Sequence, residues 1–135
     1  MWFLDTGYLI ALFSPRDAYH DAALRLQQVA QREQRILVTT DAVLFEIGAA
    51  FSKIGFRAVG TALIKTLLAD RQVRIYSVTP DLRDRAFALF AERSDKEWSL
   101  CDCLSFVVMG DNHIDAALSP DRHFGQAGFT TLMLA

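Results

Sequence analysis

The sequence predicts a single α/β domain over residues 1–135, folded as a three-layer α/β/α sandwich around a central parallel sheet of four to five strands. Short apolar segments alternate with longer segments of helical character, which is typical of a parallel sheet covered on both faces. A chain of 135 residues can bury one hydrophobic core without disulfides or a structural metal. No linker, repeat or low-complexity segment divides it.

Five short segments have the apolar character of buried strands. They cover residues 2–4, 36–39, 73–78, 116–118 and, as the fifth, 130–134. Helical patterns fill the segments between them, over residues 18–32, 42–53, 59–70, 82–92 and 100–109. In a sheet of this kind, ligands bind beyond the carboxyl ends of the strands.

The composition excludes several classes of protein. The net charge of −2 gives no overall attraction to a polyanion, so nucleic-acid binding would depend on local arginines or on metal. No apolar run approaches the roughly 20 residues of a membrane helix, and the first five residues do not resemble a signal peptide. We therefore expect a cytoplasmic protein that does not enter a membrane. A hydrophobic fraction of 52% predicts a filled core and an apolar surface for a partner.

Two cysteines, Cys101 and Cys103, are the only ones in the chain. On a helix their side chains would point to different faces, so a local disulfide or a zinc site is not expected. We predict two small, reduced side chains in the core.

Two acids follow expected strands. Asp5 comes directly after the first strand, although it could equally be the N-cap of a short helix over residues 8–13. Asp121 follows the strand at residues 116–118, although Pro120-Asp121-Arg122 is also a common turn sequence. Neighbouring parallel strands would bring the two carboxylates together.

Two further acids stand in apolar helices. Glu46 has only apolar or small neighbours over residues 42–51, so we expect its helix to be apolar all round and buried. A carboxylate there is costly without a pairing partner or a metal, and the alternative is a head group that reaches solvent. Asp102 stands near the start of the other helix, where Ser99 and Asp102 also have the spacing of a capping box.

The four acids come from distant parts of the chain, yet all fit the same edge of the sheet. Carboxylates so close together repel one another, and a cation removes the repulsion. Oxygen ligands without a nearby Cys or His pair favour Mg²⁺ or Mn²⁺ over Zn²⁺. We therefore predict that at least one of these carboxyls has a raised pKa in the metal-free protein, and that the metal ligands are Asp5, Glu46, Asp102 and Asp121.

The same residues resemble the motifs of the PIN-domain family, in particular its VapC-like toxins from bacterial toxin–antitoxin pairs. The resemblance covers essentially the whole chain. The departures are Gly7, where many members carry Ser or Asn, and Cys101 and Ser119, where Thr is frequent. The matching motifs are Phe3-Leu4-Asp5-Thr6 with Leu9-Ile10-Ala11-Leu12, Thr39-Thr40-Asp41-Ala42-Val43-Leu44-Phe45-Glu46, Trp98-Ser99-Leu100-Cys101-Asp102-Cys103, and Asp121-Arg122-His123-Phe124 with Ala127-Gly128-Phe129.

The resemblance implies a Mg²⁺- or Mn²⁺-dependent endoribonuclease, with the four acids as metal ligands and catalytic residues. It also implies an antitoxin as protein partner and tRNA or another structured RNA as substrate. In the expected chemistry, metal lowers the pKa of a bound water and the resulting hydroxide attacks phosphorus in line. We expect Glu46 to be either a ligand or the base that orients this water.

Other polar residues could support the site. Thr6 and Ser119 lie beside strand-end acids and could hold their carboxylates, although both residue types are common in turns and caps. Arg122 could bind an RNA phosphate, although an exposed arginine in a turn is more often simply solvated. We expect His123 to serve packing and hydrogen bonding rather than as a general base.

The chain also carries a candidate partner surface. Phe51, Phe56 and Leu63 could bind an antitoxin segment or a second copy in a homodimer, with core packing as the alternative use.

His20 and His113 have no recognisable ligand spacing, so we expect both at the surface.

Two other functions are weighed against a nuclease. A receiver-like phosphoacceptor domain needs a pair of acids after its first strand and a late lysine, whereas Asp5 stands alone and no lysine follows Lys96. An inactive PIN scaffold that binds RNA or protein without cutting is disfavoured because all four acids are present.

Overall fold

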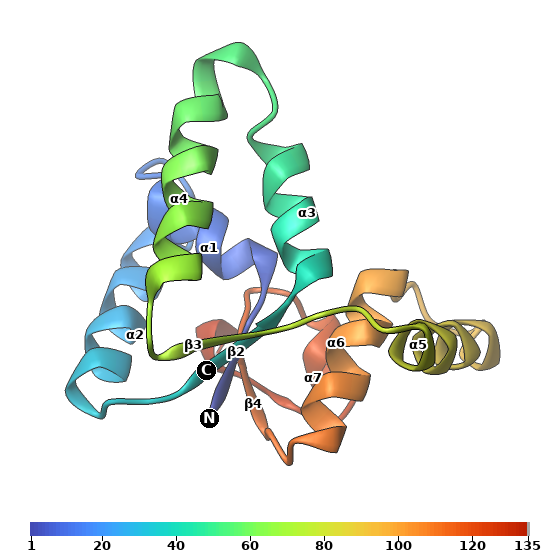
Figure 1. Cartoon of the computed structure of the whole chain (residues 1–135). Coiled ribbons are helices and arrows are strands. Elements are labelled where there is room, and N and C mark those ends of the chain that lie inside the picture. The colour runs from blue at the N-terminus through green and yellow to red at the C-terminus, as the bar shows by residue number, and fades with distance from the viewer. Residues whose placement is uncertain (135) are drawn as a thin grey trace.

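A computed structural model describes residues 1–134 and confirms the predicted architecture. A five-stranded parallel sheet of order β3-β2-β1-β4-β5 lies between layers of helices (Figure 1). The central strand β1 pairs with β2 through Trp2 and Leu37, and with β4 through Leu4 and Leu118. The strands are β1 (Trp2–Leu4), β2 (Leu37–Thr40), β3 (Val73–Tyr76), β4 (Ala116–Leu118) and β5 (Thr130–Thr131).

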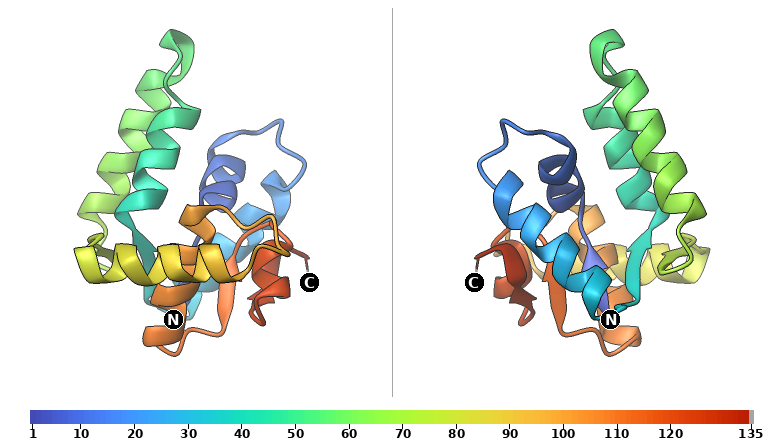
Figure 2. Two further views of the ribbon diagram at one scale, coloured as in Figure 1. Left: turned by 90° about the vertical axis from the view of Figure 1, so that its right-hand side faces the viewer. Right: turned by 90° about the vertical axis from the view of Figure 1, so that its left-hand side faces the viewer.

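The helices form two layers that cover the sheet and one hairpin that projects from it. Helices α1 and α2 cover one side of the sheet, and α5 and α6 pack together on the other side (Figures 1 and 2). Helices α3 and α4 form a hairpin that projects beyond the carboxyl ends of the strands (Figure 1). The helices are α1 (Thr6–Phe13), α2 (His20–Arg32), α3 (Asp41–Ala50), α4 (Arg57–Ala69), α5 (Pro80–Glu92), α6 (Leu100–Asp111) and α7 (His123–Gln126).

Local sequence signals explain where several helices begin. The Thr40 hydroxyl accepts a hydrogen bond from the Val43 backbone N–H at the start of α3. The Thr79 hydroxyl does the same for Leu82 at the start of α5, where Pro80 occupies the first turn. These side chains satisfy backbone donors that a helix start would otherwise leave without a partner.

An aromatic cluster anchors the end of the chain against α6. The Phe106 ring meets the Trp98 ring edge-on at 5.0 Å and the Phe124 ring edge-on at 5.1 Å. Phe124 is fully buried, and its ring centroid lies 6.1 Å from that of Phe3 in β1. Aromatic contacts of this kind fix the position of the short helix α7 relative to β1 and α6.

Helix α3 corrects one expectation. It was predicted to be buried all round, but only Val43 and Ile47 of its residues are buried, and Phe45 is 76% exposed. The reason is its place in the projecting hairpin, where it packs mainly against α1 and α4 and leaves its other side uncovered. Glu46 is therefore exposed rather than buried.

The edges of the sheet are also shorter than predicted. The fifth strand covers only Thr130–Thr131, and the 3₁₀ turn η2 (Leu132–Leu134) follows it. Strand β3 ends at Tyr76 instead of residue 78, and the Val78 backbone N–H turns away to donate to Asp41 Oδ2 at 3.3 Å. Both are edge strands with one neighbour, so fewer backbone hydrogen bonds extend them.

The fold separates residues that were predicted to act together. Phe51 and Leu63 belong to the core, whereas Phe56 is exposed beside the 3₁₀ turn η1 (Ile54–Phe56), so the three do not form one surface. Cys101 and Cys103 are both free thiols, and Cys103 is buried as predicted, whereas Cys101 is only partly buried. Of the helices over residues 1–134, none is long and apolar enough to cross a membrane.

Candidate active site

All four predicted acids line one open pocket at the carboxyl ends of the central strands. Its volume is about 470 Å³. Within residues 1–134, no lysine or arginine lines it. Carboxylates gathered without a lysine or arginine are a donor set that suits a hard divalent cation. The lining residues are Asp5, Thr6, Gly7, Tyr19, Glu46, Glu97, Ser99, Asp102, Pro120, Asp121 and His123.

Asp5 is the buried member of the group. It follows β1, is only 8% exposed, and its Oδ2 accepts a hydrogen bond from the Ser119 hydroxyl at 2.7 Å. Burial raises the pKa of Asp5 to about 6, and the nearby charges of Asp102 and Glu46 act in the same direction. The hydrogen bond from Ser119 opposes this rise without cancelling it. The prediction of one raised carboxyl pKa is therefore confirmed.

The N-cap alternative for Asp5 is only half correct. Asp5 occupies the N-cap position of α1, but its side chain makes no capping hydrogen bond to that helix. The carboxylate lines the pocket instead.

Glu46 reaches the pocket from α3. Its Oε1 accepts hydrogen bonds from the Thr6 hydroxyl at 2.6 Å and from the Cys101 thiol at 3.2 Å. Thr6 was expected to hold a strand-end acid, and it holds Glu46 instead. Burial raises the pKa of the Cys101 thiol, and Glu46 adds to this rise. The thiol therefore stays protonated and remains a donor to the carboxylate.

Asp102 both caps its helix and faces the pocket. The Ser99 hydroxyl accepts from the Asp102 backbone N–H, and Asp102 Oδ2 accepts from the Ser99 backbone N–H, each at 3.0 Å. This is the predicted capping box. The same Oδ2 lies 3.0 Å from His123 Nδ1. Capping thus fixes the Asp102 carboxylate at the mouth of the pocket.

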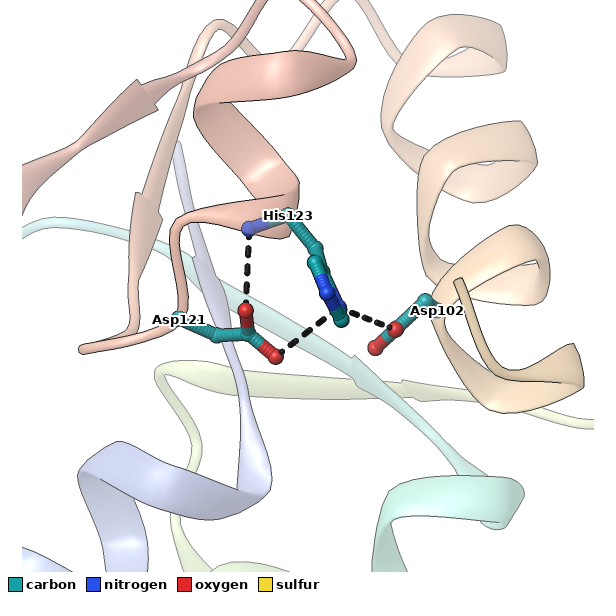
Figure 3. A group of neighbouring side chains, drawn as sticks. All are labelled: Asp102, Asp121 and His123. Atoms are coloured by element: carbon teal, nitrogen blue, oxygen red, sulfur yellow. Dashed lines mark hydrogen bonds and ion pairs between the residues drawn. The ribbon is translucent and has the colours of Figure 1, made fainter. Parts of the chain in front are cut away.

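His123 connects Asp102 with Asp121, as Figure 3 shows. Its backbone N–H donates to Asp121 Oδ1 at 2.9 Å, and its ring Nδ1 lies 3.3 Å from Asp121 Oδ2. Asp121 therefore also makes the turn that the sequence allowed. One potential ligand atom from each of Asp102, Asp121 and His123 lies within 4.8 Å of the others. The expected hydrogen-bonding role of His123 is confirmed, and its position beside two candidate ligands was not predicted.

Ser119 joins the two strand-end acids. Its hydroxyl donates to Asp5 and accepts from the Asp121 backbone N–H at 3.0 Å.

The presence of glycine at position 7, where many family members carry Ser or Asn, has a structural reason. A Cβ atom at this position would lie 2.8 Å from Cδ of Pro120, so a Ser or Asn at position 7 would collide with the Pro120 ring. Gly7 therefore fits together with the proline that precedes Asp121.

Besides the position of His123, sequence reasoning missed two residues that line the pocket, and it placed Arg122 in the site. Glu97 and Tyr19 line the pocket from loops before α6 and α2, and neither belongs to a periodic pattern that would have indicated it. Arg122 is exposed and lines a neighbouring hollow instead of this pocket.

The fold and the acid cluster agree with a known class of proteins. Residues 2–130 match the family model of the PIN domain, so the chain belongs to the PIN domain family. It is 33% identical, over 131 residues, to the 23S rRNA-specific endonuclease VapC20 from two strains of Mycobacterium tuberculosis, covering 96% of this chain and 95% of that protein. The predicted resemblance to VapC-like toxins is thereby confirmed.

A solved structure supports the same relationship. The crystal structure of Mycobacterium tuberculosis VapC20, described as a sarcin–ricin loop cleaving toxin, superposes with a TM-score of 0.86 at 28% identity. The match covers 96% of this chain and 97% of that chain. The predicted endoribonuclease activity agrees with the activity named for this relative.

Proposed function

We propose that this protein is a metal-dependent endoribonuclease, one domain over residues 1–135, that acts in the cytoplasm as the toxin of a toxin–antitoxin pair. The observation that carries the proposal is the gathering of Asp5, Glu46, Asp102 and Asp121 in one open pocket without a lysine or arginine among its lining residues in the described part of the chain. The endonuclease activity of the VapC20 relatives supports it.

The acid cluster would hold Mg²⁺ or Mn²⁺ through Asp5, Asp102 and Asp121, with Glu46 as a further ligand or as a base for the attacking water. A bound cation supplies an acidified water and neutralises charge on the leaving oxygen. Around it, Ser119 holds the Asp5 carboxylate and the capping box holds Asp102. Such supporting hydrogen bonds orient ligands and tune their basicity.

The Glu46 carboxylate is positioned to act on a proton. Thr6 and Cys101 both donate to Oε1, and no hydrogen bond within residues 1–134 engages Oε2. Because Glu46 is exposed, this second oxygen can accept a proton from water in the pocket. The assignment of Glu46 as base rests on this free oxygen.

The substrate we propose is an exposed loop of a structured RNA, first of all the sarcin–ricin loop of 23S rRNA. The named activity of the relatives supports rRNA over the tRNA that the family resemblance suggested. The pocket is open, and Tyr19, with 37% of its surface exposed, stands on its wall. Bases in RNA loops can leave their stack and pack on such an aromatic ring.

An apolar surface next to the site supports a protein partner. A groove of about 300 Å³ runs between α3, α5 and α6, beside Cys101. We propose that a second copy of the chain or the antitoxin covers it. This surface replaces the one predicted around Phe51 and Leu63. Its apolar lining residues include Ala42, Phe45, Val78, Ala86, Leu100 and Leu104.

Two experiments test the proposal. Mn²⁺ is titrated calorimetrically into wild type and Asp5→Asn, with the exposed Asp115→Asn as control. The same proteins are incubated with an RNA hairpin that carries the sarcin–ricin loop, with Mg²⁺ or Mn²⁺ and with EDTA. We expect metal binding and a single cut in wild type and control, and neither in Asp5→Asn. A folded wild type that binds no Mn²⁺ would instead favour an inactive PIN scaffold.

A further inference from the structure

A second hollow adjoins the catalytic pocket and differs from it in charge. It has a volume of about 350 Å³ and is bounded by the loop before α6 and by the start of α7. Glu97 and His123 belong to both hollows, so the two are continuous. We propose that this hollow binds a backbone phosphate of the RNA adjacent to the one that is cut. The lining residues are Asp95, Lys96, Glu97, Arg122, His123 and Gln126. This inference rests on the proposed function.

Two cations from different loops meet in this hollow. Arg122 is exposed and makes no ion pair with any residue in 1–134, while Lys96 is partly buried and lies 4.0 Å from Asp95. Arg93 binds both carboxylate oxygens of Asp95, through Nε at 2.9 Å and Nη2 at 3.1 Å. Asp95 is therefore already neutralised. The positive charge of Lys96 and Arg122 remains for an anion, whereas no lysine or arginine of residues 1–134 lines the catalytic pocket.

The backbone that carries these cations is fixed by buried contacts. The buried Trp98 donates from Nε1 to Gln126 Oε1 at 3.1 Å, which leaves the Gln126 amide NH₂ group free to donate. The Arg93 guanidinium stacks over the Trp98 ring at 4.9 Å from its centroid. Arg122 stands between Asp121, whose Oδ1 accepts from the His123 backbone N–H, and His123, whose ring Nδ1 is hydrogen-bonded to Asp102. A preformed site loses less conformational entropy when it binds its ligand.

The chemistry of the donors indicates a phosphate. Arginine, lysine and an amide NH₂ group all donate, and arginine and lysine make charge-assisted hydrogen bonds to phosphate oxygens. Glu97 on the border opposes an anion. A phosphate is therefore favoured toward the Lys96 and Arg122 side of the hollow. An RNA strand that leaves the catalytic pocket past His123 meets these two cations next.

The test measures RNA binding without cleavage, in an Asp5→Asn background. A fluorescent RNA hairpin carrying the sarcin–ricin loop is titrated with the double variant Lys96→Gln/Arg122→Gln. The control is Arg32→Gln/Arg71→Gln, which removes the same charge from the opposite edge of the sheet, where α2 ends and β3 begins. Both residues are exposed, and circular dichroism checks that every variant is folded.

We expect the double variant to bind RNA about tenfold more weakly than its parent at physiological salt, the loss typical of charged hydrogen bonds. The slope of log affinity against log salt should fall by about 0.7 for the lost phosphate contact. The control should stay within about twofold of the parent, because its charges lie far from the RNA. A further variant, Glu97→Gln, should bind more tightly.

The outcomes separate the two proposals. Equal losses in the double variant and in the control would show general electrostatic attraction and would overturn the phosphate site. Cleavage of the hairpin by wild type, together with unchanged binding in the double variant, would overturn the phosphate site alone. A wild type that neither binds nor cuts the hairpin would contradict the proposed function, and this inference with it.

Discussion

Replacing Asp5 with Asn should stabilise the metal-free protein while removing metal binding. Burial raises the pKa of this carboxyl from its ordinary value of 3.8 to about 6. Between these two values the folded protein keeps a proton that the unfolded chain has released, so the free energy of unfolding falls as the pH rises. Above the folded-state pKa, the ionised Asp5 lowers the stability by about 3 kcal/mol.

Asparagine has nearly the same shape and carries no charge. Its amide oxygen can still accept the hydrogen bond from Ser119. We therefore expect Asp5→Asn to raise the free energy of unfolding by up to about 3 kcal/mol at roughly pH 7.5, and to make little difference near pH 3.8. Mn²⁺ should stabilise the wild type and leave the variant unchanged, because a ligand stabilises only the state that binds it.

Urea unfolding followed by tryptophan fluorescence measures these differences. Trp2 and Trp98 are both buried, so their emission reports the loss of the core. The titrations are run in EDTA across the acidic and neutral range, with the exposed Asp115→Asn as control. A variant no more stable than wild type at neutral pH would refute the reasoning. So would an advantage that persists undiminished in acid.

Further predictions concern four single positions. Gly60→Ala should lower stability by about 1–3 kcal/mol, because the Cβ of the new alanine would lie only 2.7 Å from the Cβ of Phe51. Gly48→Ala has open space and should raise stability by about 0.5–1 kcal/mol, and thermal unfolding compares the two. Gly7→Ser should weaken Mn²⁺ binding in calorimetry by displacing Pro120. Cys101 should react with iodoacetamide at least about tenfold more slowly than a free thiol near pH 8, because its raised pKa lowers the thiolate fraction.

The central part of the fold could be predicted because its sequence signals are local and agree with one another. Strands β1 and β4 are uninterrupted apolar segments that end just before polar residues, and both were predicted with their observed bounds. The edge strand β5 was overestimated. The apolar composition of residues 130–134 does not show that the sheet ends there, since that depends on the absence of a further neighbour.

Sequence reasoning identified the four acids of the candidate site and three hydroxyl residues that hold them, Thr6, Ser99 and Ser119, but it missed other lining residues. Asp5 and Asp121 could be placed because acids after buried strands point to the functional edge of a parallel sheet. The exposure of Glu46 could not, because an apolar helix looks the same in sequence whether or not another layer covers it. Glu97, Tyr19 and His123 were missed as members of the site, because the loops before α6 and α2 and the start of α7 place them there.

The order of the proposed metal ligands along the chain also determines when the site can form during translation. Asp5 belongs to the central strand, but the hydroxyl that holds its carboxylate comes from Ser119, 114 positions later, and Asp121 follows. Until β4 has emerged from the ribosome and paired beside β1, a nascent chain lacks both. The proposed metal site therefore cannot assemble until nearly all of the domain has been synthesised.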